Sequence, residues 1–173
     1  MLVVAATERE LVRVYGADVF ACGVGPVEAA VRTARMLAER RPDAVLHVGI
    51  AGGRGIDLLT VVLGSVSFYC DVSAAIAVVD RVEPDASLLE RVRGRLPYAR
   101  VLPIGTSAAV GGAAGYDVEA MEGFGVLRAC ELAGVPAVEL RVVTNDVAEP
   151  DRKKWRFDEA FSVLGDAVAR VLA

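Results

Sequence analysis

The chain has 173 residues and a mass of 18.2 kDa, a length that favours one domain over two. Its formal net charge of −4 and its scattered basic residues argue against a nucleic-acid-binding surface. Its apolar runs are far shorter than the roughly 20 residues that cross a bilayer. We therefore expect neither nucleic acid nor membrane as a partner, and without a secretory signal we expect a cytoplasmic protein.

Short Val- and Ile-rich runs alternate with longer helical patterns, which is typical of βαβ units. Strands are predicted over residues 2–6, 18–22, 44–50, 65–71, 99–104 and 136–143. Helices are predicted over residues 26–40, 85–93, 121–133 and 155–172, and the Gly- and Ala-rich residues 105–115 are expected to form a loop. The chain from 1 to 173 is thus expected to form a single α/β domain with its chemistry at the carboxyl ends of the strands.

The cysteines and the single histidine are interpreted as core residues. Cys22, Cys70 and Cys130 are odd in number and widely spaced, as expected of reduced thiols in a cytoplasm. His47 lies inside a predicted strand without a His or Cys cluster around it, so no metal site is expected.

Two short segments after predicted strands can carry chemistry. In residues 6–10, a carboxylate at the end of a strand can act as a general base, although these residues can also be solvated turn charges. Gly23 and Gly25 open a helix in a weak match to a dinucleotide-binding turn. The acidic residue that should bind a ribose, Asp43, precedes the next strand instead of ending it, so a tight turn near a pocket is favoured.

Two further segments place small or paired residues where a ligand can bind. Residues 49–53 are mostly glycine and alanine, which lets backbone N–H groups approach a ligand. In residues 118–124, an acidic side chain in a first helical turn is explained by the helix dipole alone. The thioether of the neighbouring Met121 suggests a sugar-binding site. Met121 can pack on an apolar sugar face while Glu122 accepts hydrogen bonds from two vicinal hydroxyls.

Taken in order, residues 6–10, 23–25, 49–53, 120–123 and 141–145 resemble the nucleoside phosphorylase and nucleosidase superfamily over nearly the whole chain. Within it, residues 118–125 and 151–155 are similar to the futalosine hydrolase family, which removes hypoxanthine from futalosine on a route to menaquinone. The resemblance implies a three-layer fold with a mixed, twisted central sheet flanked by helices. It also implies a small purine nucleoside as substrate, no cofactor, and a homodimer or larger homo-oligomer.

The resemblance assigns roles to individual residues. Glu10 matches the carboxylate that activates water, and Glu122 matches the ribose-binding glutamate. Asn145 falls where nucleosidases of 6-aminopurines carry an aspartate, and its NH₂ can donate toward N7 and O6 of a hypoxanthine-type base. A shift of one residue would place Asp146 there instead and favour adenine. Ile50 replaces a Ser or Thr of many relatives and cannot donate to phosphate, which argues for water as the attacking species.

The remaining candidates are less constrained. The predicted substrate-binding residues are Ile50, Ala51, Gly52, Phe68, Met121, Glu122 and Trp155, with Glu10 and Asn145 as catalytic residues. Phe68, Tyr69 and Trp155 can stack on the base or can fill core and subunit contacts, and the shortness of residues 56–117 leaves this open. The alternatives are a methylthioadenosine or S-adenosylhomocysteine nucleosidase, a purine nucleoside phosphorylase, and a nucleotide-binding domain without catalysis.

Overall fold

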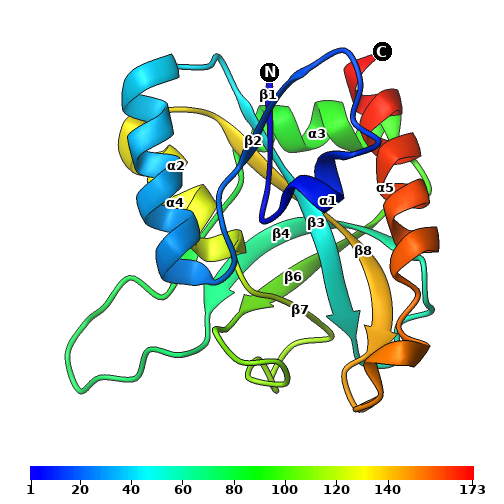
Figure 1. The fold of residues 1–173 in the computed structure, drawn as a ribbon. Helices are drawn as coiled ribbons and strands as arrows, with labels where there is room; N and C mark the ends of the chain where they lie inside the picture. The colour runs from blue at the N-terminus through cyan, green and yellow to red at the C-terminus, as the bar shows by residue number, and fades with distance from the viewer.

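A computed structural model describes residues 1–173 and shows a mixed sheet between two layers of helices (Figure 1). The strands are β1 (Leu2–Ala5), β2 (Asp18–Ala21), β3 (Val45–Gly53), β4 (Val61–Tyr69), β5 (Arg81–Val82), β6 (Arg100–Thr106), β7 (Val118–Ala120) and β8 (Ala137–Asp146). The helices are α1 (Glu8–Leu11), α2 (Pro26–Arg40), α3 (Ala86–Arg95), α4 (Gly123–Ala133) and α5 (Phe157–Leu172), with a 3-10 turn at Arg152–Lys154. The expected mixed α/β fold with a flanked central sheet is confirmed.

The sheet is open at one end and curls into a ring at the other. Strands β2, β1, β3 and β8 are parallel neighbours. Strand β4 pairs antiparallel with β8 and parallel with β6, β6 pairs with β7, and β7 returns antiparallel to the end of β3. The five strands of this ring share one apolar cluster, formed by Ala51, Val62, Ile104, Val118, Ala120 and Val143. The ring therefore gives the carboxyl ends of β3 and β8 a rigid support.

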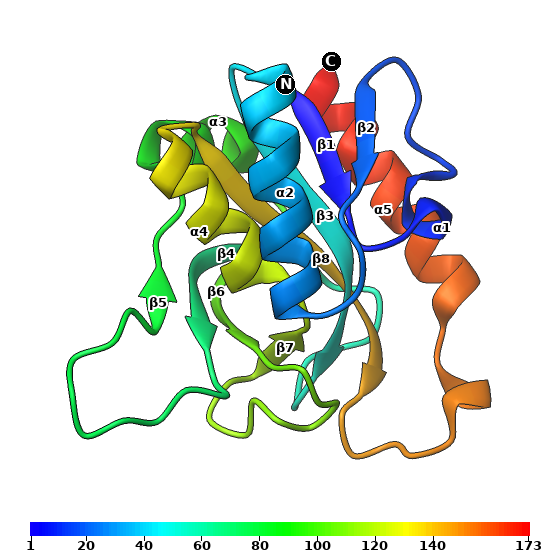
Figure 2. The ribbon, with the colours of Figure 1, turned by 60° about the vertical axis from the view of Figure 1, so that its left-hand side comes forward.

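Both faces of the sheet are covered, as Figure 2 shows. Helices α2 and α4 pack together on one face, where Leu2 and Val4 of β1 join their apolar cluster. Helices α3 and α5 cover the other face, where Val3 and Ala5 of the same strand are buried. This alternation along one strand is what a sheet buried on both sides requires.

Helix α2 shows how the sequence dictates one of these layers. Its buried residues Ala29, Thr33 and Met36 recur at helical spacing and form the stripe that faces α4 and the sheet. Pro26 stands at the first helical position, where a missing N–H costs nothing. Gly25 before it has φ of 92°, a conformation that side chains other than glycine rarely adopt.

Several element boundaries differ from the sequence-based expectation. Strand β4 begins at Val61 instead of residue 65, and β8 continues to Asp146 instead of ending at 143. The helix expected from Met121 begins at Gly123, because Val118–Ala120 pair as β7 with β3 and β6. Such pairings between distant segments override local propensity. None of the helices combines the length and the apolar character needed to cross a membrane.

Candidate active site

A cavity of about 400 Å³ opens where β1, β3 and β8 end, with the turn before α4 on its other side. All the predicted catalytic and substrate-binding residues except Phe68 line it, and Tyr69, the other stacking candidate, packs on Phe124 instead. The cavity residues are Ala6, Thr7, Arg9, Glu10, Val24, Ile50, Ala51, Gly52, Ala109, Val110, Glu119, Ala120, Met121, Glu122, Thr144, Asn145, Arg152, Trp155, Phe157 and Phe161. The structure thus brings together side chains that are up to 155 positions apart, from Ala6 to Phe161.

Glu10 is held by the short helix α1, which was not predicted, although Thr7 and Glu10 form a capping box at its start. The backbone N–H and the hydroxyl of Thr7, the residue before α1, both donate to Glu10 Oε2 at 2.9 Å. Glu10 Oε1 accepts from the backbone N–H of Ile50 on β3 at 3.3 Å. A carboxylate offers about four lone-pair sites, so these three donors fix the buried group and leave about one site for a water.

Glu122 lies at the amino end of α4 with its side chain 6% exposed. Its Oε1 accepts from the backbone N–H of Gly25 at 3.1 Å, and its Oε2 lies 3.4 Å from Arg141 Nη1. Burial raises the pKa of Glu122, while Arg141 and the Gly25 N–H offset part of that rise. The carboxylate is therefore more basic than an exposed one and is suited to accept hydrogen bonds from sugar hydroxyls.

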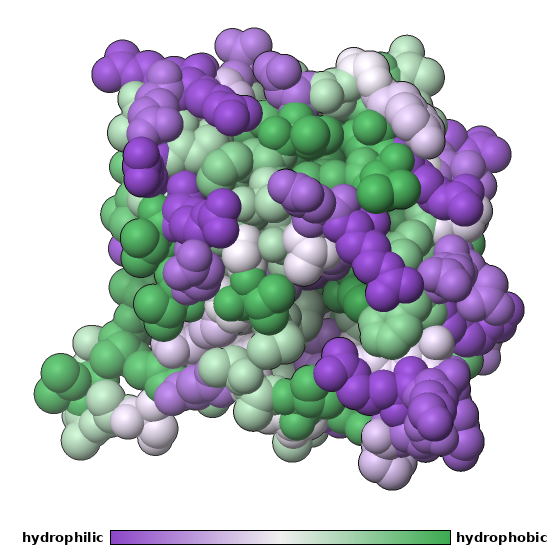
Figure 3. Space-filling view, viewed as in Figure 1, coloured by the Kyte–Doolittle hydropathy of each residue, from purple (hydrophilic) through white to green (hydrophobic).

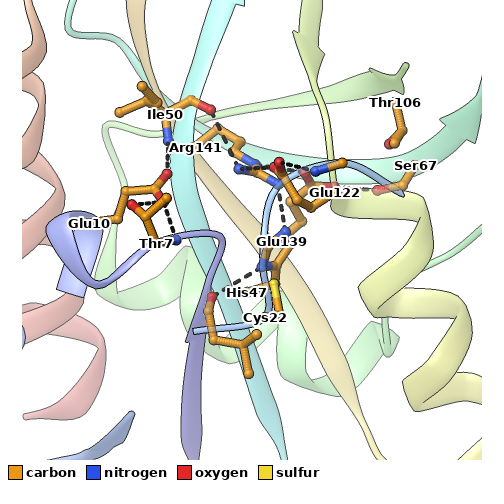
Figure 4. A network of polar contacts seen from close by, with 12 residues as sticks. Thr7, Glu10, Cys22, His47, Ile50, Ser67, Thr106, Glu122, Glu139 and Arg141 are labelled. Carbon is orange, nitrogen blue, oxygen red and sulfur yellow. Dashed lines mark hydrogen bonds and ion pairs between the residues drawn. The ribbon is translucent and has the colours of Figure 1, made fainter. Parts of the chain in front are cut away.

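Arg141 of β8 connects the two halves of a buried polar network (Figure 4). Its guanidinium donates through Nε to Glu139 Oε1 at 2.8 Å and through Nη1 to the Ile50 carbonyl at 3.4 Å, beside Glu122. Burial alone would lower its pKa, but the charges of Glu139 and Glu122 outweigh this effect and raise it. Arg141 therefore stays charged and connects the Glu122 carboxylate to Glu139 in the core of the sheet.

Neutral side chains complete the hydrogen bonds of Arg141 and Glu139 on the side away from Glu122. The Nη2 of Arg141 lies 2.6 Å from His47 Nε2, and His47 Nδ1 lies 3.1 Å from the Val4 carbonyl. Since an arginine only donates, His47 accepts at Nε2 and donates from Nδ1. Burial and then Arg141 lower the pKa of His47 well below its ordinary value, so it is a neutral core residue. The hydroxyl of Ser67 on β4 donates to Glu139.

Small residues make room for the network. A Cβ on Gly49 of β3 would overlap Arg141 Nη1 and would stand 2.8 Å from Glu10 Oε1. A Cβ on Gly123 at the start of α4 would overlap the Glu139 carboxylate. The sequence indicated residues 49–53 and 141–145 as site segments but gave Arg141 and Glu139 no role. The available signal was a pair of charged residues two positions apart in an otherwise apolar strand, which places both on one face.

Asn145 lines the cavity, whereas its neighbour Asp146 is exposed and is absent from the cavity lining. The amide Nδ2 of Asn145 donates to the Asp146 carbonyl at 3.0 Å, and its Oδ1 accepts from the Thr144 hydroxyl at 2.7 Å. The Asp146 carboxylate instead accepts from the backbone N–H of Ala148 at 2.8 Å. The geometry therefore favours Asn145 as the residue that faces a ligand.

An aromatic wall comes from the carboxyl-terminal part of the chain. Trp155 lines the cavity together with Phe157 and Phe161, two residues at helical spacing that the sequence did not single out. Arg9 lies over the rings of Phe157 and Phe161, at 5.7 and 5.0 Å from their centroids. Phe68 lies elsewhere, stacked on a tyrosine at 4.8 Å.

A loop between β6 and β7 supplies the opposite wall through Ala109 and Val110. It is held by Glu119, whose carboxylate accepts from the backbone N–H of Gly111 at 2.5 Å and pairs with Arg54 at 2.7 Å. Arg54 also donates to the loop carbonyl of Tyr116 at 2.8 Å. The Gly-rich stretch is thus a wall held by a partly buried ion pair.

All three cysteines are free thiols. Burial raises the pKa of Cys22 and of Cys130 to about 12, which keeps both thiols protonated and unreactive at neutral pH. Cys70 is half-buried and unpaired. The structure contains no group of three or more His, Cys, Asp and Glu side chains placed to hold a metal ion.

Comparisons with known proteins identify the family and the fold. The family model described as "Phosphorylase superfamily" matches residues 12–173. Futalosine hydrolase of Streptomyces coelicolor is 34% identical over 186 aligned positions, covering 90% of this chain and 78% of the relative. A futalosine hydrolase mutant of Helicobacter pylori superposes with a TM-score of 0.88 at 14% identity, covering 99% of this chain and 97% of that one. A 5′-methylthioadenosine nucleosidase of Arabidopsis thaliana superposes with a TM-score of 0.87 at 17% identity, covering 99% and 93%.

These similarities differ in what they show. The two superpositions, at identities below 25%, establish the fold. The sequence match to the Streptomyces enzyme covers most of both chains. It therefore also shows that this chain is related in sequence to enzymes that cleave glycosidic bonds. The chain therefore belongs to the phosphorylase superfamily and is a nucleosidase-type member of it.

Proposed function

We propose that this protein hydrolyses the N-glycosidic bond of a 6-oxopurine nucleoside, with futalosine as substrate and hypoxanthine and dehypoxanthine futalosine as products, in menaquinone biosynthesis. The observation that carries the proposal is that Glu10, Glu122 and Asn145 line one cavity. Its volume of about 400 Å³ is within the range of small-molecule sites. The similarity to futalosine hydrolases over most of the chain supports the choice of substrate.

The hydrolysis requires a water molecule, a bound sugar and a stabilised leaving base. Glu10 accepts the proton of a water whose oxygen bonds to the anomeric carbon, while the bond from that carbon to N9 breaks and leaves its electrons on the base. Glu122 accepts hydrogen bonds from the ribose hydroxyls and holds the ring. The transition state carries positive charge on the sugar, and the carboxylates of Glu10, Glu122 and Glu139 outnumber the single guanidinium of Arg141 beside them.

The leaving base is stabilised by Asn145. As the glycosidic bond breaks, negative charge develops on the purine, and an amide N–H pointing at N7 or O6 stabilises that charge. A 6-oxopurine offers acceptors at both positions, whereas adenine carries a donor at its 6-amino group. The exposed position of Asp146 supports this assignment, because an adenine-selective acid one residue later would not reach the cavity.

Ile50 supports water over phosphate as the nucleophile. Its side chain lines the cavity between Glu10 and Arg141, at the backbone position that contacts both. An alkyl group cannot donate to a phosphate oxygen and would remove water from it without compensation. Arg141, which donates to the Ile50 carbonyl, is already paired with two carboxylates. Its guanidinium is therefore not free to bind a phosphate dianion.

The test is release of free base. The protein is incubated with futalosine, inosine or methylthioadenosine, with and without phosphate, and the released hypoxanthine or adenine is measured. Hypoxanthine release that does not depend on phosphate is the expected result. Glu10→Gln should lower kcat by about 10²- to 10⁴-fold, the usual range for a general base, while hypoxanthine binding stays within about twofold of wild type. Glu8→Gln, in the same helix, is the matched control.

The alternatives have distinct outcomes in the same assay. Release of adenine from methylthioadenosine would favour the activity named for the Arabidopsis neighbour. Base release that requires phosphate would favour a phosphorylase, and tight binding without turnover would favour a non-catalytic domain. We also expect a cytoplasmic homodimer or larger homo-oligomer, as the sequence resemblance implies.

A further inference from the structure

Strand β8 is irregular at the point where it reaches the cavity. Ala51 of β3 pairs with Val143, but the next residue, Gly52, pairs with Asn145, so Thr144 is an extra residue in the ladder. In a regular strand, neighbouring side chains point to opposite faces. Here both Thr144 and Asn145 line the cavity, which is the kind of redirection that a β-bulge produces beside a functional site.

The bulge brings two side chains into contact and leaves one orientation for the Asn145 amide. The side-chain atom that lies 3.0 Å from the Asp146 carbonyl must be the NH₂ group, because a carbonyl oxygen can only accept. The other amide atom is therefore Oδ1, and it lies 2.7 Å from the Thr144 hydroxyl, which donates to it. Thr144 is 1% exposed, and the competing acceptor for its hydroxyl, the Ala51 carbonyl, lies farther away at 3.2 Å.

We propose that Thr144 is the residue that determines base selectivity, by locking the Asn145 amide so that it presents N–H and not C=O to the purine. The inference rests on the proposed function, which it deepens. Asn145 has two N–H bonds, and the Asp146 carbonyl takes one of them. A single N–H remains for N7 or O6 of a 6-oxopurine. If the amide turned over, it would present an acceptor, which matches the 6-amino donor of adenine.

The matched substitutions are Thr144→Val and Thr144→Ser. Valine keeps the shape and the branched Cβ but removes the hydroxyl, whereas serine keeps the hydroxyl. We expect Thr144→Val to lower the ratio of kcat/KM for futalosine to kcat/KM for its 6-amino analogue by about tenfold, the effect of one oriented hydrogen bond. Thr144→Ser should keep the ratio within about twofold of wild type. A Thr144→Val ratio within twofold of wild type, in a folded variant, would overturn the proposal.

A measurement without substrate tests the lock itself. Neutron diffraction on deuterated wild-type protein distinguishes ND₂ from oxygen and shows the hydroxyl deuterium. We expect ND₂ beside the Asp146 carbonyl and the Thr144 deuterium directed at Asn145 Oδ1. An amide in the opposite orientation, or a deuterium directed only at the Ala51 carbonyl, which lies 3.2 Å from the same hydroxyl, would overturn the lock even if Thr144→Val failed to fold.

The two proposals fail in different ways. If wild-type protein releases no base from any nucleoside, the proposed function is wrong. The dissociation constants of free hypoxanthine and free adenine then replace kcat/KM, with the same tenfold and twofold criteria for the two variants. Loss of the hypoxanthine preference in Thr144→Val alone supports the lock, and an unchanged preference contradicts it.

Discussion

Arg141 is buried in the sheet, and its charge is balanced by Glu139 and Glu122 at 2.8 and 3.4 Å. Replacing it with methionine would leave those two carboxylates without their cation in a dry environment. Breaking a buried ion pair in this way costs about 3–5 kcal/mol of unfolding free energy. We expect Arg141→Met to lose stability of that order in urea denaturation.

The control for this loss is an ion pair on the surface. Arg35 pairs with Glu39 at 3.0 Å on α2, with both side chains largely exposed. Such pairs contribute about 0–1 kcal/mol, because water screens them. Arg35→Met should therefore change the unfolding free energy by less than about 1 kcal/mol. Equal losses in the two variants would show that the buried network does not stabilise the fold.

The raised pKa of Glu122 predicts an acidic limb in the pH profile. Burial makes this carboxyl bind a proton at a higher pH than an ordinary glutamate, whose pKa is about 4.3. Once protonated, Glu122 accepts fewer hydrogen bonds from ribose. As the pH falls, kcat/KM should therefore decline before exposed glutamates titrate. Measured profiles should show this limb in wild type and lack it in Glu122→Gln; a limb that persists in the variant would assign it to another group.

At the scale of single residues, the sequence predicted which side chains line the site better than it predicted which residues contact them. Glu10, Glu122 and Asn145 were predicted as site residues because their residue types and neighbouring motifs fit a nucleosidase, and the structure brings them to one cavity. Glu139 and Thr144 were not predicted. The contacts of Glu139 depend on which segments pack against β8, and those of Thr144 depend on the bulge between β8 and β3. Both arise from pairing between segments that are far apart in the chain.

Two glycines differ in the space around them: Gly49 lies in strand β3 beside the site, and Gly94 lies in helix α3. A Cβ at Gly49 of β3 would overlap Arg141 and crowd Glu10, whereas one at Gly94 of α3 would meet nothing within 4 Å. Gly49→Ala should lower both stability and kcat/KM. Gly94→Ala should stabilise the protein by up to about 1 kcal/mol, since alanine loses less backbone entropy in a helix. Thermal unfolding and base-release assays check both, and full activity in Gly49→Ala would contradict the packing argument.

Elements with strong periodicity were predicted well, and those that depend on distant partners were not. The bounds of α2 match the prediction, because its apolar stripe, Pro26 and the following turn are all local signals. Helix α1 is only four residues long, too short for a periodic pattern. Strand β7 has three residues and exists through its pairing with β3 and β6. Of these two elements, which were not predicted, α1 carries Glu10 and β7 ends two residues before Glu122.

The molecule as a whole exposes apolar residues on a projecting segment between β4 and β5, seen at the lower left of Figures 1 and 3. There Ile76 is 76% exposed and Val79 is 53% exposed. Exposed apolar residues that cluster on one projection are typical of a surface that contacts another protein chain. The expected homo-oligomer would cover such a segment and remove its apolar surface from water.

The oligomer prediction is tested by placing charge on this projection. Ile76→Asp combined with Val79→Asp should shift the mass in sedimentation toward that of a single 18.2 kDa chain, because a buried, unpaired carboxylate strongly opposes association. Leu132→Asp, on α4 at a site 72% exposed, is the control and should leave the mass unchanged. A wild-type protein that sediments as one chain at micromolar concentration would contradict the oligomer. A double variant that keeps the wild-type mass would place the interface elsewhere on the molecule.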